Sequence, residues 1–183
     1  MEQRSVSLSY DQLLALKDYS EQGGSERYSA FARGKGPKPD LYDALISIFE
    51  SDLLSSVPPG LTLYRGISGV NLALDEGADN PEKNVMSTSV RMDVAERFTG
   101  GNSCCIYELR PVVGSRISLI SMEGFTSVEN ECEILLPPNT TIKDVTLNRV
   151  TPGSMPGVGT ARTLVYGGLL ENADPRFQGS TGF

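Results

Sequence analysis

The chain has 183 residues, of which 39% are hydrophobic, and its formal net charge is −7. This length can bury one substantial core, so we expect a single domain. The negative charge opposes generic attraction to nucleic acid or to anionic lipid, and neither is expected as a partner. The sequence has no apolar run near the roughly 18 residues of a membrane span and no N-terminal secretory stretch, so we expect no membrane segment and no classical export.

Histidine is absent, and the three cysteines include the adjacent pair Cys104 and Cys105. The lack of histidine removes the commonest zinc ligand and the usual activating base of a serine or cysteine nucleophile. Adjacent cysteines argue against a disulfide framework. We therefore expect a reducing compartment, no metal, and chemistry carried by carboxylates, arginines and hydroxyls.

The first third of the chain is predicted to be helical. Ser9 and Gln12 form a capping-box pattern, and apolar residues at helical spacing follow it as far as Gly23. A second, short helix is expected near Tyr28. A third helix, with a stronger apolar stripe, is predicted over 39–58, where prolines and a glycine end it.

From residue 61 onward the pattern changes to short strands. The expected strands span 61–65, 85–90, 104–109, 116–120, 132–136, 141–145, 147–150 and 162–166. One short helix interrupts them, with Asp93 as its predicted cap and Glu96 as the reciprocal partner.

Helices followed by strands indicate an α+β fold. We expect an N-terminal helical layer packed on a mixed, mainly antiparallel, two-sheet β core. Within one domain over 1–183, the helical region covers 1–58, the β core covers 61–150, and a C-terminal strand and tail cover 151–183.

Carboxylates occupy alternating positions directly before the apolar run Ile-Leu-Leu-Pro. Residues two apart on an extended strand share a face, so Glu131 and Glu133 are expected to project together, roughly 6 to 7 Å apart. Like charges on one face repel and have low β-propensity, which indicates a role beyond folding. The alternative is a solvated strand edge whose charge resists aggregation.

A guanidinium and three hydroxyls complete the candidate chemistry. Arg65 ends a core-facing row of residues, and a buried arginine needs an anion, which is either a bound phosphate or a structural carboxylate. Ser87, Thr88 and Ser89 lie in a predicted strand between apolar residues. A buried hydroxyl must find a partner, and one that faces a carboxylate can hold it in position.

Taken in order, these patterns resemble the Arg-Ser-Glu class of mono-ADP-ribosyltransferases, chiefly bacterial toxins and effectors. The patterns are an aromatic-Arg strand end at Arg65, Ser-Thr-Ser from Ser87, an Ala-x-x-Phe helix ending at Phe98, and Glu-x-Glu before Ile-Leu-Leu-Pro. The resemblance covers roughly 61–145, and the upstream helices are also similar to that family's N-terminal region. It implies the ADP-ribosyltransferase fold, with NAD as co-substrate and no metal.

The resemblance also implies a role for each matching residue. Glu133 would be the catalytic glutamate that meets the 2′-hydroxyl of the nicotinamide ribose, and Ser87 would orient it. Glu131 would orient the acceptor and assist its deprotonation, a role that accompanies arginine acceptors in this family. Phe125, in the loop before the acidic residues, would contact the substrate protein.

The NAD contacts implied by the resemblance centre on Arg65, which would hold the diphosphate. The other expected contacts are Gly66, Thr88, Ser89 and Phe98, with the phenylalanine against the nicotinamide half. Two departures stand out. Ala32 replaces an asparagine that this family uses to touch NAD, and Glu129 adds a third acidic residue at the same spacing, so a register shift of two residues stays open.

The resemblance implies a secreted toxin or virulence effector that transfers ADP-ribose from NAD to a protein in a foreign cell, on arginine, with actin or a small GTPase among the expected targets. Export by a dedicated system or a carrier, action in the target-cell cytoplasm, and an immunity protein or carrier toxin as partner are further expectations. The alternatives are an NAD glycohydrolase, a non-catalytic interaction domain on the same scaffold, and an unrelated α+β protein with chance motifs.

Overall fold

A computed structural model describes residues 7–51, 55–58, 60–68, 74–75, 77–99, 104–112, 117–124, 132–152 and 162–172. The helices in these ranges are α1 (Tyr10–Ser20), α2 (Gly24–Ala32), α3 (Tyr42–Phe49) and α4 (Met92–Arg97). The strands are β1 (Ser55–Ser56), β2 (Leu63–Ser68), β3 (Asn80–Glu82), β4 (Met86–Ser89), β5 (Cys104–Pro111), β6 (Ser118–Ser121), β7 (Glu133–Leu136), β8 (Thr140–Pro152) and β9 (Arg162–Asn172).

Each expected helical segment is present, and the capping box of α1 is confirmed. The Ser9 hydroxyl accepts a hydrogen bond from the backbone N–H of Gln12 at 3.2 Å, and the Gln12 side chain accepts one from the backbone N–H of Ser9 at 2.8 Å. These two contacts satisfy N–H groups that a helix start leaves without partners.

Two of the helix predictions were wrong in detail. The third helix ends at Phe49, not near residue 58, because Ser55 and Ser56 pair with β6 as an edge strand. In α4 the N-cap is Arg91 with no side-chain cap, and Asp93 lies in the first turn. The Asp93 carboxylate accepts hydrogen bonds from the Arg91 side chain at 2.6 and 3.0 Å, so the guanidinium takes up the oxygens that a cap would use.

The described strands follow one continuous pairing order, β1-β6-β7-β4-β2-β5-β9-β8-β3. Among them only β5 and β9 run parallel, so the mainly antiparallel character is confirmed, whereas the pairing shows no division into two sheets. The expected strands 141–145 and 147–150 join into β8, which carries register shifts against β9. An ion pair between Arg65 on β2 and Glu82 on β3 joins strands four places apart in this order, so the sheet must curl.

Two hydrophobic cores lie on either side of the curled sheet. The first contains Leu16, Tyr28, Leu45 and other buried residues of α1 to α3, packed with Leu135 of β7. The second lies on the opposite face, is formed mainly by side chains of the strands, and contains Leu136 of β7. Successive residues of a strand point to opposite faces, so Leu135 and Leu136 bind β7 to both cores. This double anchoring holds the strand that begins at Glu133.

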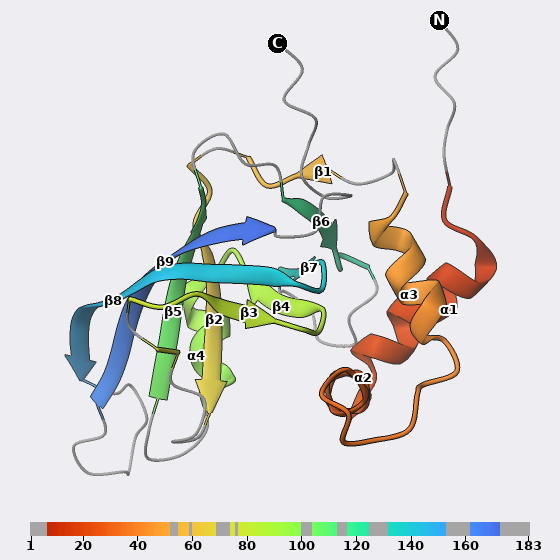
Figure 1. The fold of residues 1–183 in the computed structure, drawn as a ribbon, viewed down its shortest axis with the longest axis horizontal. Coiled ribbons are helices and arrows are strands. Elements are labelled where there is room, and N and C mark those ends of the chain that lie inside the picture. Colours follow the sequence, from red (N-terminus) through yellow and green to blue (C-terminus); the bar gives the residue numbers. More distant parts are fainter. Residues whose placement is uncertain are drawn as a thin grey trace, which may run out of the picture.

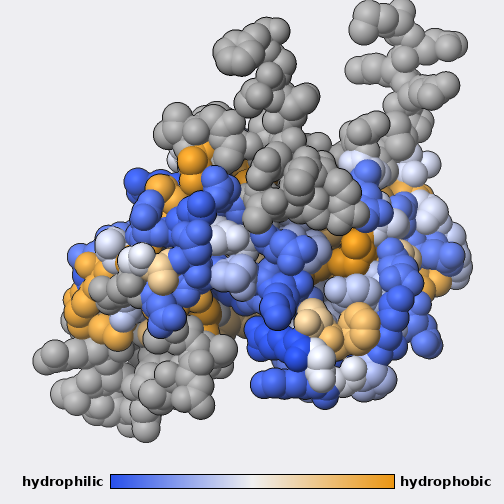
Figure 2. Space-filling view, viewed as in Figure 1, coloured by the Kyte–Doolittle hydropathy of each residue, from blue (hydrophilic) through white to orange (hydrophobic). Residues whose placement is uncertain are grey.

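The three N-terminal helices group together beside the ends of β6 and β7, while α4 lies against the sheet (Figure 1). The elements that α4 contacts are β2, β4 and β5. Hydrophilic residues cover much of the face in Figure 2, and hydrophobic residues gather over the left-hand ends of β8 and β9. Within the described part of the chain, none of the helices is long and apolar enough to cross a membrane.

Candidate active site

A cleft of about 490 Å³ lies between the α1–α2 segment and the face formed by β2, β4 and α4. We call it the cleft throughout. Its lining residues are Tyr19, Ser20, Glu21, Gln22, Gly23, Ser25, Glu26, Ser29, Tyr64, Arg65, Gly66, Ser87, Thr88, Ser89, Val94, Ala95, Phe98 and Glu133. Every expected catalytic or NAD-contacting residue within the described ranges is therefore at the wall of one cleft.

Glu133 and Ser87 are joined directly. Antiparallel pairing of β4 with β7 places Ser89 opposite Glu133 and Ser87 opposite Leu135. Ser87 and Ser89 share a face of β4, so Ser87 is diagonal to Glu133 on that face. Its hydroxyl donates a hydrogen bond to Oε1 of Glu133 at 2.5 Å. Both side chains are half-buried, and the contact fixes the orientation of the carboxylate at the cleft wall.

The two neighbouring hydroxyls serve the backbone. Thr88 and Ser89 are buried, and the Thr88 hydroxyl donates to the carbonyl oxygen of Ile134 at 2.9 Å. The Ser89 hydroxyl accepts from the backbone N–H of Arg91 at 3.0 Å. These bonds tie β4 to β7 and to the start of α4, so both residues position the walls of the cleft that they line.

Arg65 reaches the cleft from β2 and also contacts a carboxylate. Its Nη2 lies 3.3 Å from Oε2 of Glu82, and Nη2 of Arg33 lies 3.7 Å from the same oxygen. The side chains of Arg65 and Glu82 are only 20% and 19% exposed, so this charge pair is partly desolvated. A structural carboxylate, one of the two partners expected for this guanidinium, is therefore present.

The residue after Arg65 is a glycine, Gly66, and α4 comes very close to β2 at this position. A Cβ atom at Gly66 would lie 1.8 Å from the carbonyl oxygen of Ala95, which no real side chain allows. Glycine is the residue that permits such a close approach of two backbones. Gly66 lines the cleft, and the structure gives it a clear packing role.

Phe98 stands at the rim of the cleft. It is the C-cap residue of α4, and 56% of its surface is exposed. Such exposure of a large aromatic ring leaves a flat apolar surface beside the cleft. The position fits a ring that packs against a planar group of a bound molecule.

Sequence reasoning missed several residues of the opposite wall. Tyr19 appeared only as part of the apolar stripe of α1, yet it is buried and lines the cleft. Burial, together with the nearby Glu133 carboxylate, raises the pKa of the Tyr19 phenol well above its usual value. The phenol therefore stays neutral. In α2, Ser29 lines the cleft, whereas Ala32, which replaces the expected asparagine, is not among the lining residues.

Three residues of the acidic segment and its loop lie outside the described residues: Phe125, Glu129 and Glu131. The first described residue after them, Cys132, has a φ of 45°, and β7 begins at Glu133. Left-handed backbone is not extended, so β7 begins one residue later than the predicted start at Cys132. The expected spacing of Glu131 and Glu133 concerns a residue outside the described ranges.

No protein-family model and no curated protein matches the sequence. Solved structures do match. The ADP-ribosyltransferase Vis of Vibrio splendidus, in complex with agmatine, has a TM-score of 0.61 and 18% identity over 91% of this chain and 76% of its own. For the Clostridium limosum C3 exoenzyme the TM-score is 0.60 and the identity 17%, over 91% and 87% of the two chains.

Exoenzyme S from Pseudomonas aeruginosa, solved with a human 14-3-3 protein and carba-NAD, has a TM-score of 0.57 and 20% identity over 87% of this chain and 74% of its own. The chain has the ADP-ribosyltransferase fold. The expected α+β class is thereby confirmed. At identities of 17 to 20% the likeness concerns the fold alone. The function of this chain must therefore be argued from the residues of the cleft.

Proposed function

We propose that the protein is an NAD-dependent mono-ADP-ribosyltransferase that transfers ADP-ribose to a protein and releases nicotinamide. The observation that carries the proposal is the hydrogen bond from Ser87 to Glu133 in a cleft that Arg65 also lines. These residues come from three separate strands. Chance motifs give no reason for them to meet at one cleft.

The residues of the cleft fit NAD as a substrate. Its volume, about 490 Å³, is within the range of sites for small molecules and cofactors. Arg65 provides a guanidinium suited to the diphosphate, and Phe98 provides an exposed aromatic surface for the nicotinamide half. Thr88 and Ser89 complete the nearby wall. A described neighbour in fold, exoenzyme S, was solved with carba-NAD, which supports this choice of substrate.

The chemistry follows from the position of Glu133. Cleavage of the bond between ribose and nicotinamide passes through an oxocarbenium-like state, and a fixed carboxylate stabilises the positive charge that develops. Ser87 holds Oε1 of Glu133, so the carboxylate does not need to reorient during the reaction. Nicotinamide leaves as a neutral molecule. The Tyr19 phenol is also neutral, so it adds no further charge to the cleft.

We propose arginine as the acceptor. A guanidinium is protonated and is a poor nucleophile, so a second carboxylate near it is needed as a base. Glu131 is proposed for this role, with Phe125 contacting the target protein. The fold neighbour Vis was solved with agmatine, a small molecule that carries a guanidinium group, which supports an acceptor of this chemistry.

We propose one catalytic domain over 1–183, delivered by a dedicated system or carrier and acting in the cytoplasm of a target cell. Actin or a small GTPase is the proposed class of target. The reaction needs no metal.

The experiment is labelling in lysates. Wild type and Glu133→Gln are incubated with labelled NAD in host and bacterial lysates, and labelled bands are identified by mass spectrometry. A discrete band that disappears with Glu133→Gln supports the transferase and names the target and acceptor. Release of free ADP-ribose without labelling would instead mark an NAD glycohydrolase. If neither product forms and NAD does not bind, the scaffold is a non-catalytic interaction domain.

A further inference from the structure

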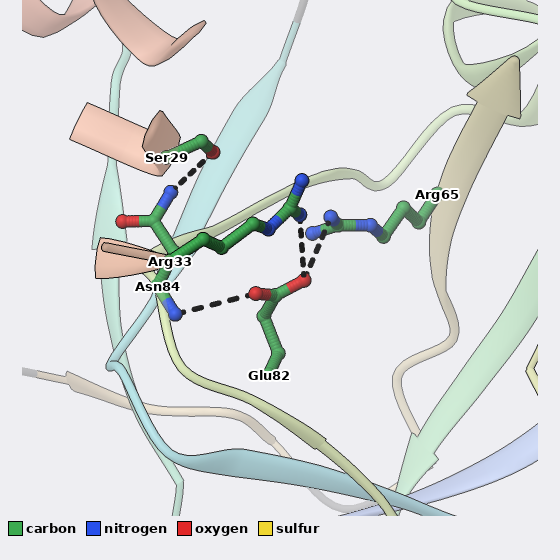
Figure 3. A network of polar contacts seen from close by, with 5 residues as sticks. All are labelled: Ser29, Arg33, Arg65, Glu82 and Asn84. Carbon is green, nitrogen blue, oxygen red and sulfur yellow. Dashed lines mark hydrogen bonds and ion pairs between the residues drawn. The ribbon is translucent and has the colours of Figure 1, made fainter. Parts of the chain in front are cut away.

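Two arginines from different elements converge on one carboxylate (Figure 3), and one of them, Arg65, also lines the cleft. Arg65 lies on β2, Arg33 is the C-cap residue of α2, and Glu82 ends β3. Both guanidiniums approach the same oxygen, Oε2 of Glu82, at 3.3 and 3.7 Å. Glu82 therefore occupies the position that an external anion would take between the two arginines.

The contacts of Glu82 are long. Charged hydrogen bonds between arginine and carboxylate are usually about 2.7 to 2.9 Å, and strong ones use both oxygens against one guanidinium. Here Oε1 of Glu82 instead accepts from the backbone N–H of Asn84 at 3.3 Å. By contrast, Arg27 and Asp18 of this chain lie 2.7 Å apart. Glu82 is thus shared by two guanidiniums through one oxygen, at distances longer than those of a tight ion pair.

The backbone behind Glu82 is anchored independently of the arginines. The buried Asn84 side chain donates a hydrogen bond from Nδ2 to the Ser29 hydroxyl at 2.6 Å (Figure 3). This bond ties the segment after β3 to α2. Asn139 donates its backbone N–H to the carbonyl oxygen of Glu82 at 2.7 Å. The Glu82 side chain can thus swing away from the arginines while its backbone stays in place.

We propose that Glu82 is an internal competitor of the anionic substrate: it neutralises Arg65 and Arg33 in the ligand-free protein and is displaced by the diphosphate of the bound molecule. The inference rests on the proposed function, which supplies the diphosphate. A diphosphate presents several oxygens and two charges to two guanidiniums, whereas Glu82 presents one oxygen. The affinity of the cleft for diphosphates is then set by the balance between the two anions, because a site that must first be vacated binds more weakly.

The opposite role is a carboxylate that stays in place and positions Arg65. That role predicts short, paired contacts, and it predicts that neutralising Glu82 weakens binding. Displacement predicts that neutralising Glu82 strengthens binding, because the glutamine neither competes as strongly for the guanidiniums nor repels the incoming diphosphate. The sign of the change decides between the two roles.

The test is calorimetric titration of wild type and Glu82→Gln with ADP-ribose and with nicotinamide at fixed ionic strength. We expect Glu82→Gln to bind ADP-ribose on the order of fivefold more tightly, with nicotinamide binding unchanged. Glu26→Gln removes the same charge from the cleft wall, where Glu26 accepts a hydrogen bond from Ser25, and serves as the matched control. Arg33→Gln, at a side chain that is 41% exposed, is expected to weaken ADP-ribose binding.

Weaker or unchanged binding of ADP-ribose by Glu82→Gln would overturn the proposal, as would an equal gain in Glu26→Gln. If thermal unfolding showed that Glu82→Gln does not fold, Arg33→Gln would decide: unchanged ADP-ribose binding by this variant would also overturn the proposal. The binding readout is separate from turnover. Tighter ADP-ribose binding by Glu82→Gln without NAD cleavage would support the displacement of Glu82 and contradict the proposed function. NAD cleavage that depends on Glu133, without tighter ADP-ribose binding by Glu82→Gln, would support the proposed function and contradict the displacement.

Discussion

The Ser87 hydroxyl donates to Oε1 of Glu133 across the β4–β7 ladder at 2.5 Å. The two residues are 46 positions apart in sequence. They meet because antiparallel pairing places Ser89 opposite Glu133, and Ser87 lies two residues before Ser89 on the same face of β4. The packing of Leu135 and Leu136 into opposite cores holds this register. The orientation of the carboxylate is thus a consequence of the hydrophobic pattern of β7.

Replacing Ser87 by alanine is expected to lower kcat for NAD cleavage by roughly tenfold to a hundredfold, the equivalent of one hydrogen bond to a charged group. The KM for NAD should change little, because the diphosphate contact remains. Steady-state nicotinamide release measures both constants. Ser51→Ala, which removes a hydroxyl bonded within the helical region, is the control. A loss confined to KM would contradict the positioning role of Ser87.

Replacing Gly66 by alanine is expected to destabilise the fold by about 1 to 3 kcal/mol, because the added Cβ collides with the rigid carbonyl of Ala95. Urea unfolding gives the change. Gly167→Ala is the matched control, since its Cβ would meet the end of the Asn148 side chain, which can rotate away. Equal losses in the two variants would show that the contact between α4 and β2 does not constrain Gly66.

We expect the free energy of unfolding to fall at high pH, because Tyr19 of the helical core is buried as a neutral phenol. Burial, then the nearby Glu133 carboxylate, raises the pKa of Tyr19 above the usual tyrosine value of about 10. The folded state therefore holds this proton at a pH where the unfolded chain has lost it, so the stabilisation is complete below about pH 10 and declines as the pH rises beyond it.

Tyr19→Phe removes this titration. The urea midpoint of wild type is expected to fall more between pH 8 and pH 11 than that of Tyr19→Phe, with the other buried tyrosines giving the variant its remaining pH dependence. Identical declines in the two proteins would mean that Tyr19 does not titrate against folding.

The sequence predicted the elements that have clear local patterns. The capping box at Ser9 and the strands that carry Ser87 and Glu133 depend on residues close in sequence. The order of the motifs joined Arg65, Ser87 and Glu133 into one site. Sequence patterns did not reveal β1 and β3, because strands of two and three residues have no periodicity to detect.

Long-range charge pairing was equally hidden. Glu82 meets Arg65 and Arg33 only because the sheet curls and α2 ends beside β3, and no spacing in the sequence encodes that meeting. Tyr19 shows the same limit. Its place in an apolar stripe is compatible with a core residue, and it became a cleft residue because α1 ends at the cleft wall.

The most direct test of the account is release of nicotinamide from NAD by the purified protein in the presence of lysate proteins, with wild type compared to Glu133→Gln. The substitution keeps the shape of the side chain and removes the charge that is proposed to stabilise the oxocarbenium-like state. We predict that wild type releases nicotinamide and that Glu133→Gln is slower by about 100-fold or more. Equal rates in the two folded proteins, or no release by wild type that binds NAD, would contradict the account.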